Sequence, residues 1–146
     1  MVDKIKVNDL TGGCLCGAIR YRCSGEPDST GLCQCNRCQR QSGSSFLIAV
    51  VYTRSAVAFE QGELCSYVAQ DDEGATLTRH FCGACGSPIM ITLDRYPEIR
   101  SIMGGSVDDK SRLKPTFSLW CSTSQPWLSL PVRIEQHSAY PDGLIA

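Results

Sequence analysis

The chain has 146 residues, of which 42% are hydrophobic, and a formal net charge of −1 from 14 basic and 15 acidic side chains. This length is typical of one compact domain, so we expect a single domain over residues 1–146. The balanced charge gives no electrostatic drive toward nucleic acid or an anionic membrane, and neither is expected as a partner.

In chain order, short segments with strand character dominate. Alternating polar and apolar residues predict half-buried strands at 4–7 and 18–23, and the Val- and Ile-rich segment 45–52 predicts a buried strand. Further strands are predicted at 57–60, 65–69, 76–81, 88–93, 99–103, 117–120 and 132–136. The helical candidate near the cysteines is "NRCQRQS", residues 36–42, and the tail "SAYPDGLIA" has the composition of irregular surface chain. The pattern indicates a mainly β protein, a sandwich or barrel with short strands and little helix.

Ten cysteines are the most informative feature of the composition. The start of the chain, "MVDKIKVNDLTGG", lacks the apolar segment and cleavage site of a secretory signal. The longest apolar run, "FLIAVVY" at 46–52, is far shorter than the roughly 18 residues of a membrane-spanning helix. We therefore expect a cytoplasmic protein, and in a reducing cytosol this cysteine density favours metal or thiol chemistry over disulfides.

Two cysteine pairs have the spacing of a closed zinc site. "GGCLCGA" contains a C-x-C and "FCGACGSP" a C-x-x-C, both framed by glycines that allow tight turns. Together they supply four thiols, Cys14, Cys16, Cys82 and Cys85, for a structural zinc. The alternatives are buried cysteines that act as small hydrophobic residues, or a redox-active C-x-x-C. The redox motif expects a strand–helix context, whereas the predicted context is strand–turn–strand.

The stretch "CQCNRC" adds a triplet, Cys33, Cys35 and Cys38, that is one thiol short of a closed site. Three protein ligands with an open position are the arrangement of a catalytic zinc. Cys121 or His80 would instead close the site as a fourth ligand. Cys23 and Cys65, at the ends of predicted strands, are expected to be inert core cysteines. Spacing alone leaves the open and closed sites as alternatives.

Four blocks in order, "GGCLCGAIRY", "CQCNRCQRQSGSSF", "TRHFCGACGSPI" and "LWCSTSQPW", resemble the glutathione-dependent formaldehyde-activating enzyme family, whose relatives include centromere protein V. The match runs from about Gly12 to Trp127. The resemblance implies an Mss4-like zinc-containing β fold, with a structural zinc on the two pairs and a more labile catalytic zinc on the triplet. Gln34 and Ser118 stand where the family often has histidine.

The resemblance also implies a reaction, the joining of glutathione and formaldehyde into S-hydroxymethylglutathione, which is classed with carbon–sulfur lyases. Zinc is then the cofactor, and a small thiol and an aldehyde are the partners, while the oligomeric state stays open. Arg37, Arg40 and Arg79 lie close in sequence to the cysteines and are candidates to offset thiolate charge and bind glutathione's carboxylates.

Two other functions stay open at this stage. A non-catalytic zinc module of the same fold, acting in binding or as a chaperone, needs only the four-cysteine zinc. A thiol-redox enzyme needs a reactive cysteine away from metal, for which Cys121 is the candidate.

Overall fold

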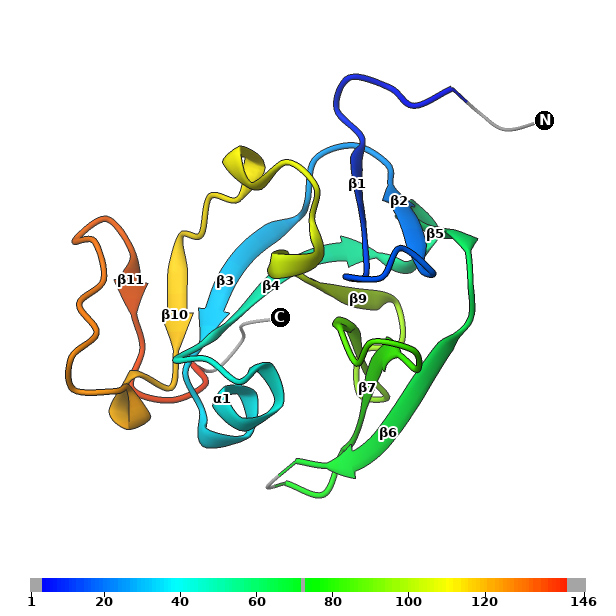
Figure 1. The fold of residues 1–146 in the computed structure, drawn as a ribbon. Helices are drawn as coiled ribbons and strands as arrows, with labels where there is room; N and C mark the ends of the chain where they lie inside the picture. Colours follow the sequence, from blue (N-terminus) through cyan, green and yellow to red (C-terminus); the bar gives the residue numbers. More distant parts are fainter. Residues whose placement is uncertain (1–3, 72, 142–146) are drawn as a thin grey trace.

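The computed structural model describes residues 4–71 and 73–141, and these form a mainly β structure with one α-helix (Figure 1). The strands are β1 (Leu10–Gly13), β2 (Arg20–Cys23), β3 (Ser29–Cys33), β4 (Leu47–Thr53), β5 (Val57–Gln61), β6 (Leu64–Gln70), β7 (Thr76–Cys82), β8 (Pro88–Leu93), β9 (Ile99–Met103), β10 (Phe117–Leu119) and β11 (Glu135–Gln136). The helix α1 spans Asn36–Ser42, and short 3-10 turns lie at Arg54–Ala56, Gly104–Ser106, Lys110–Arg112 and Cys121–Thr123. The predicted fold class, mainly β with little helix, is confirmed.

The strands form two sheets. A three-stranded antiparallel sheet has the order β1-β2-β5, and an eight-stranded sheet has the order β11-β10-β3-β4-β9-β8-β7-β6. In the large sheet β10 pairs in parallel with both β3 and β11, and the other pairs are antiparallel. Figure 1 shows the small sheet at the upper right, above β9 and β7 of the large sheet, and α1 below the strands β3 and β4.

Several element predictions need correction. Residues 4–7 form no strand, because Ile5 and Val7 are exposed and this segment pairs with no other. Of the segment predicted at 132–136 only Glu135–Gln136 is strand, and Val132 is fully exposed. Strands β1 and β3, which are short and contain glycine, were not predicted. The tail lies outside the described residues from position 142 onward, and the single-domain boundary stays a prediction.

The core is divided into two clusters. The larger lies between the two sheets and includes Tyr21 and Tyr52, each only 1% exposed, together with Cys14 and Cys82. The buried hydroxyl of Tyr21 pairs with Ser106 Oγ at 2.7 Å, which removes the cost of burying it. The smaller cluster contains Cys38, Leu47, Ile91 and Met103, with Cys33, Cys35, Ala49 and Leu77 packed against it. Each cluster therefore contains cysteines from one of the two sets found in the sequence.

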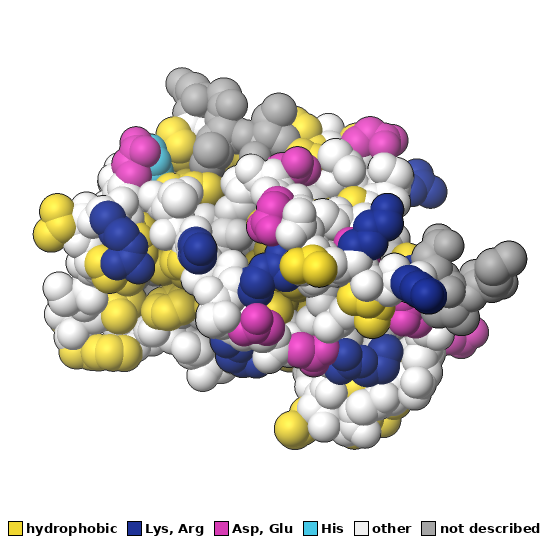
Figure 2. All heavy atoms as spheres, turned by 90° about the horizontal axis from the view of Figure 1, so that it is seen from above, with side chains coloured by type: hydrophobic (Ala, Val, Ile, Leu, Met, Phe, Trp, Pro, Cys, Tyr) yellow, Lys and Arg dark blue, Asp and Glu magenta, His cyan; other side chains and the backbone are white. Residues whose placement is uncertain are grey.

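The surface is mixed in charge. Seen from above in Figure 2, Lys and Arg side chains lie interspersed with Asp and Glu, and apolar side chains gather on the side of the molecule that carries β10 and β11. The chain between those two strands includes Trp127, which is 72% exposed. Within the described ranges, no helix is both long enough and apolar enough to cross a membrane.

Candidate metal centres

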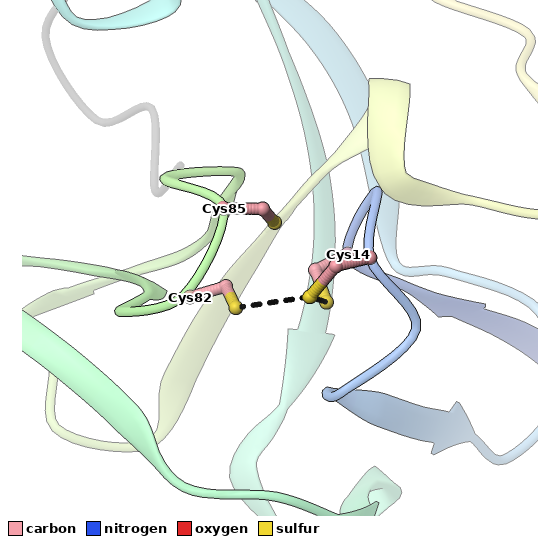
Figure 3. A group of neighbouring side chains, drawn as sticks. Cys14, Cys82 and Cys85 are labelled. Atoms are coloured by element: carbon pink, nitrogen blue, oxygen red, sulfur yellow. Dashed lines mark hydrogen bonds between the residues drawn. The ribbon is translucent and has the colours of Figure 1, made fainter.

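The first cysteine cluster joins two distant turns. Cys14 and Cys16 lie on the turn between β1 and β2, whereas Cys82 ends β7 and Cys85 lies on the turn that leads to β8. The four sulfur atoms lie within 4.8 Å of one another. In Figure 3 the side chains of Cys82 and Cys85 point from their turn toward Cys14. The cluster therefore connects the small sheet to the large one.

The local sequence shapes the second of these turns. Gly86 has a φ of +79°, which an L-amino acid with a side chain rarely adopts. Its N–H donates to the carbonyl of Cys82 at 2.8 Å, and Cys82 N–H donates to the carbonyl of Ser87 at 3.0 Å. Gly83 faces Cys65, where a Cβ would lie 2.5 Å from Sγ. The glycines of "FCGACG" thus serve the turn that carries both thiols.

Donors already surround the sulfur atoms of this cluster. The backbone N–H of Ile19 donates to Cys14 Sγ at 3.2 Å, and Ser87 Oγ lies 3.1 Å from Cys85 Sγ. The Ser87 side chain and backbone hydrogen bonds lower the pKa of Cys85 to about 5. A backbone hydrogen bond at Ala18 lowers the pKa of Cys16, but contacts with the other three cysteines, together with burial, outweigh it and raise that pKa to about 11. Four adjacent thiols cannot all ionise unless a cation shares the site.

The distances fit a tetrahedral zinc. With Zn–S bonds of about 2.3 Å, the edges of a tetrahedron of sulfur atoms measure about 3.8 Å. Cys16 Sγ lies 3.5 Å from Cys14 Sγ and 3.8 Å from Cys82 Sγ. The four side chains therefore form a cluster that is able to hold a metal ion of this kind.

The second cluster is the triplet. Cys33 ends β3, Cys35 caps the start of α1 by accepting a hydrogen bond from Cys38 N–H at 3.3 Å, and Cys38 lies on the buried side of the helix. Their sulfur atoms also lie within 4.8 Å of one another. The predicted helix 36–42 is confirmed, and it ends at Gly43, whose φ of +66° suits the left-handed cap.

Hydrogen bonds within the triplet give its three thiols different pKa values. Hydrogen bonds from Cys33 and Cys38 lower the pKa of Cys35 to about 2, and the same contacts raise the pKa of Cys33. For Cys38, contact with Cys33 lowers the pKa, but contact with Cys35 and burial outweigh it and raise the pKa to about 11. Ionisation of one thiol opposes ionisation of its neighbours, so three thiolates in one cluster require an added cation.

Neither predicted fourth ligand belongs to the triplet. His80 hydrogen-bonds to Thr92 at 3.0 Å, and it follows Arg79, which contacts Cys38, so strand alternation turns it to the opposite face of β7. Cys121 Sγ accepts from Gln34 Nε2 at 3.4 Å instead. Among residues 4–71 and 73–141, no further Cys, His, Asp or Glu joins the three sulfur atoms. The triplet therefore offers three sulfur atoms as candidate ligands, and the described residues add no fourth candidate beside them.

The three predicted arginines occupy different environments. Arg37 and Arg40 are exposed on α1, whereas Arg79 on β7 is 7% exposed and points Nη2 at Cys38 Sγ, 3.9 Å away.

The prediction for the isolated cysteines is half right. Cys23 is fully buried, but Cys65 is exposed because β6 is the edge strand of the large sheet.

A polar network beside the triplet was not predicted. Gln39 on α1 donates through Nε2 to the carbonyl oxygens of Gln34 at 2.7 Å and Thr123 at 2.9 Å. Gln34 and Ser118, the two positions that depart from the resembled family, contact each other through a 2.9 Å hydrogen bond. Sequence spacing does not relate Gln39 to Thr123 or Gln34 to Ser118, since each of these pairs lies 84 residues apart. The network ties the helix of the triplet to the chain that follows β10.

The fold and the two cysteine clusters define a β protein with two sites able to hold metal. The family model described as glutathione-dependent formaldehyde-activating enzyme matches residues 9–123. This match covers most of the chain, and the protein belongs to that family.

Two further comparisons agree with this placement. A Halomonas elongata protein whose name assigns it provisionally to the same enzyme is 27% identical, over 94% of this chain and 92% of its own length. The crystal structure of a Rhodobacter sphaeroides protein superimposes with a TM-score of 0.53 at 23% identity, covering 67% of this chain and 87% of that one. The structural likeness supports the fold alone.

Proposed function

We propose that the protein is a zinc-dependent enzyme of the carbon–sulfur lyase type, with an Mss4-like fold, that joins a thiol to an aldehyde. Glutathione and formaldehyde are the first candidates, with S-hydroxymethylglutathione as the product. Family membership supports the substrates, and the observation that carries the proposal is the triplet with three sulfur ligands and one open position.

The two clusters have different proposed roles. Cys14, Cys16, Cys82 and Cys85 hold a structural zinc, because four ligands complete its coordination. Cys33, Cys35 and Cys38 hold a catalytic zinc. When bound there, zinc stabilises an added thiol as its thiolate, which is the nucleophilic form at neutral pH. All ten cysteines are free, which suits a reducing compartment, and we place the protein in the cytoplasm.

The chemistry is an addition to a carbonyl. The substrate sulfur forms a bond to the aldehyde carbon, the π electron pair of the carbonyl moves to oxygen, and the proton lost from the thiol ends on that oxygen. The reverse reaction breaks the same carbon–sulfur bond. The protein's contribution is to hold the thiolate and orient it. Arg37 and Arg40, exposed on α1 beside the triplet, are the proposed contacts for the carboxylates of glutathione.

The test is the rate at which formaldehyde and glutathione exchange, measured by NMR exchange spectroscopy on zinc-loaded protein. We expect wild type and the control Cys65→Ser, an exposed cysteine outside both clusters, to accelerate exchange equally. Cys35→Ser should lose the acceleration. An exchange rate that wild type leaves unchanged at every zinc loading would contradict the proposal and favour the non-catalytic zinc module.

A further inference from the structure

Arg79 lies in the middle of β7, on the face of the large sheet that carries the triplet. Its register partners are Tyr67 on the edge strand β6 and Ile91 on β8. Ile91 and Leu77 belong to the apolar cluster around Cys38, so Arg79 enters the same cluster as a charged residue. With 7% exposure, its guanidinium is largely removed from water.

The guanidinium has few partners for a buried cation. Nη2 donates to Cys38 Sγ at 3.9 Å, and Nη1 is buried without any hydrogen-bond partner. In the part of the chain that the structure describes, Arg79 makes no ion pair with a carboxylate. Arg20, Arg22, Arg95 and Arg112 all pair with Asp or Glu at the surface. Arg79 is thus the most buried arginine of the described residues, and it has no carboxylate partner there.

A buried charge is stable only when a counter-charge or a set of hydrogen bonds replaces the lost water. The group in contact with Arg79 is the triplet, which becomes anionic when it binds a metal. The missing counter-charge of Arg79 and the excess negative charge of the loaded triplet therefore match.

The charges can be counted for the loaded site. Three thiolates with one divalent cation carry −1, and Arg79 brings this total to zero. An anionic fourth ligand then makes it −1, whereas without the arginine it would make −2 in a partly buried cluster. Interactions between such charges are strong because little water screens them.

We propose that Arg79 is the built-in counter-charge of the Cys33–Cys35–Cys38 cluster, which allows the triplet to hold a divalent metal as three thiolates and still admit an anionic fourth ligand, a substrate thiolate. This inference rests on the proposed function and narrows its substrate class to ligands that bind as anions. Arg79 is a positioning residue here, because it acts through Cys38. The exposed Arg37 and Arg40 cannot serve this role, since solvent screens them.

The experiment compares Arg79→Met, which keeps much of the side-chain length and removes the charge, with Arg40→Met, the same change at an exposed site on α1. Zinc affinity of the triplet is measured by competition with a chelator. Partners that support metal ligands typically contribute 10–100-fold to metal affinity, so Arg79→Met should lose about that much and Arg40→Met almost nothing.

The charge of the fourth ligand is tested with cobalt in the triplet, whose absorption spectrum reports ligand binding. The probes are 2-mercaptoethanol, which binds as a thiolate and has no carboxylate, and imidazole, which binds as a neutral ligand. In Arg79→Met we expect the affinity for 2-mercaptoethanol to fall by about tenfold or more, with imidazole affinity changed less than about threefold. Equal losses for both probes, or zinc affinity equal to that of wild type, would overturn the inference.

A third variant protects the test against misfolding. Arg79→Lys keeps the charge, so it should retain zinc and thiol affinity within about threefold of wild type; losses as large as those of Arg79→Met would show that charge is not the cause. If Arg79→Met fails to fold, as judged by loss of zinc from the four-cysteine cluster, Arg79→Lys decides alone. None of these measurements requires turnover, so a protein with this binding pattern and no effect on glutathione–formaldehyde exchange would contradict the proposed function only.

Discussion

Cys82→Ser should lower the stability of the folded protein far more than Cys35→Ser. A metal held by the four-cysteine cluster closes the loop between Cys16 and Cys82, which contains residues 17–81. Treated as a covalent cross-link, a loop of that length removes about 4 kcal/mol of chain entropy from the unfolded state. Against a total stability of about 5–15 kcal/mol this is a large share.

The triplet closes much shorter loops. Between Cys33, Cys35 and Cys38 the chain has only one to four intervening residues, and the same relation gives about 2 kcal/mol. Cys35 also caps α1, and serine is a good capping residue, so Cys35→Ser keeps the cap and offsets part of the loss. The two variants should therefore differ clearly in stability although each removes one sulfur.

Thermal and urea unfolding of the zinc-loaded variants measures this difference. We expect Cys82→Ser to lose about 4 kcal/mol, or roughly 8–16 °C in melting temperature for a chain of this size. Cys23→Ser is the matched control, since Cys23 is as buried as Cys82 and belongs to neither cluster, so it reports the cost of burying a hydroxyl alone. A Cys35→Ser variant that unfolds as readily as Cys82→Ser, or a Cys82→Ser variant no weaker than Cys23→Ser, would refute the reasoning.

Three further predictions concern metal, pH and backbone. Elemental analysis should find two zinc ions per chain, and mild chelation should remove only the one that Cys35→Ser also lacks; a single zinc that Cys35→Ser retains would contradict this. Hydrogen bonds from Arg20 lower the pKa of Asp108 in the folded protein below its ordinary value of 3.8. The Arg20–Asp108 ion pair therefore stabilises the fold fully above pH 3.8, and this stabilisation is lost as the pH falls through the lowered pKa. Asp108→Asn should thus lower the free energy of unfolding by about 0.2–1 kcal/mol at pH 7 and by little at strongly acid pH, as measured by urea unfolding. A stability difference between wild type and variant that does not change with pH would contradict this prediction. Gly86→Ala should cost about 1–2 kcal/mol because of its φ of +79°, while Gly105→Ala, with open space and no positive φ, should be close to neutral; equal effects would contradict the strain argument.

The sequence predicts the local features of this protein well, because they depend on neighbouring residues. Helix α1 over 36–42 matches its prediction, and most central strands are found where alternation or β-branched residues indicate them. The segment 4–7 alternates equally well but has no neighbouring strand to pair with, and pairing is what makes a strand. Strand β3 was missed because "STGLC" is weak in strand formers, and its position between β4 and β10 stabilises it nonetheless.

The cysteine clusters are also predictable from the sequence only in part. Spacing groups Cys14 with Cys16 and Cys82 with Cys85, and the structure brings all four together. Spacing cannot tell whether His80 faces the triplet, since that depends on the register of β7 in the sheet. Nor can it show that Arg79 is buried while Arg37 and Arg40 are exposed. Burial of a charged residue depends on contacts between distant segments, and these are fixed only when the sheet has formed.

The two cysteine clusters belong to different parts of the hydrophobic core. Cys14 and Cys82 belong to the core between the sheets, whereas Cys38 belongs to the smaller core beneath α1. A site that binds and releases a substrate thiolate must change its ligand set in every cycle, and such a change is tolerated best where little of the fold depends on it. The four-cysteine cluster joins the two sheets, and 65 residues of chain separate its first pair of cysteines from its second. The proposed exchange at the triplet could therefore proceed while the sheets stay joined, so an open metal site there would be compatible with a stable fold.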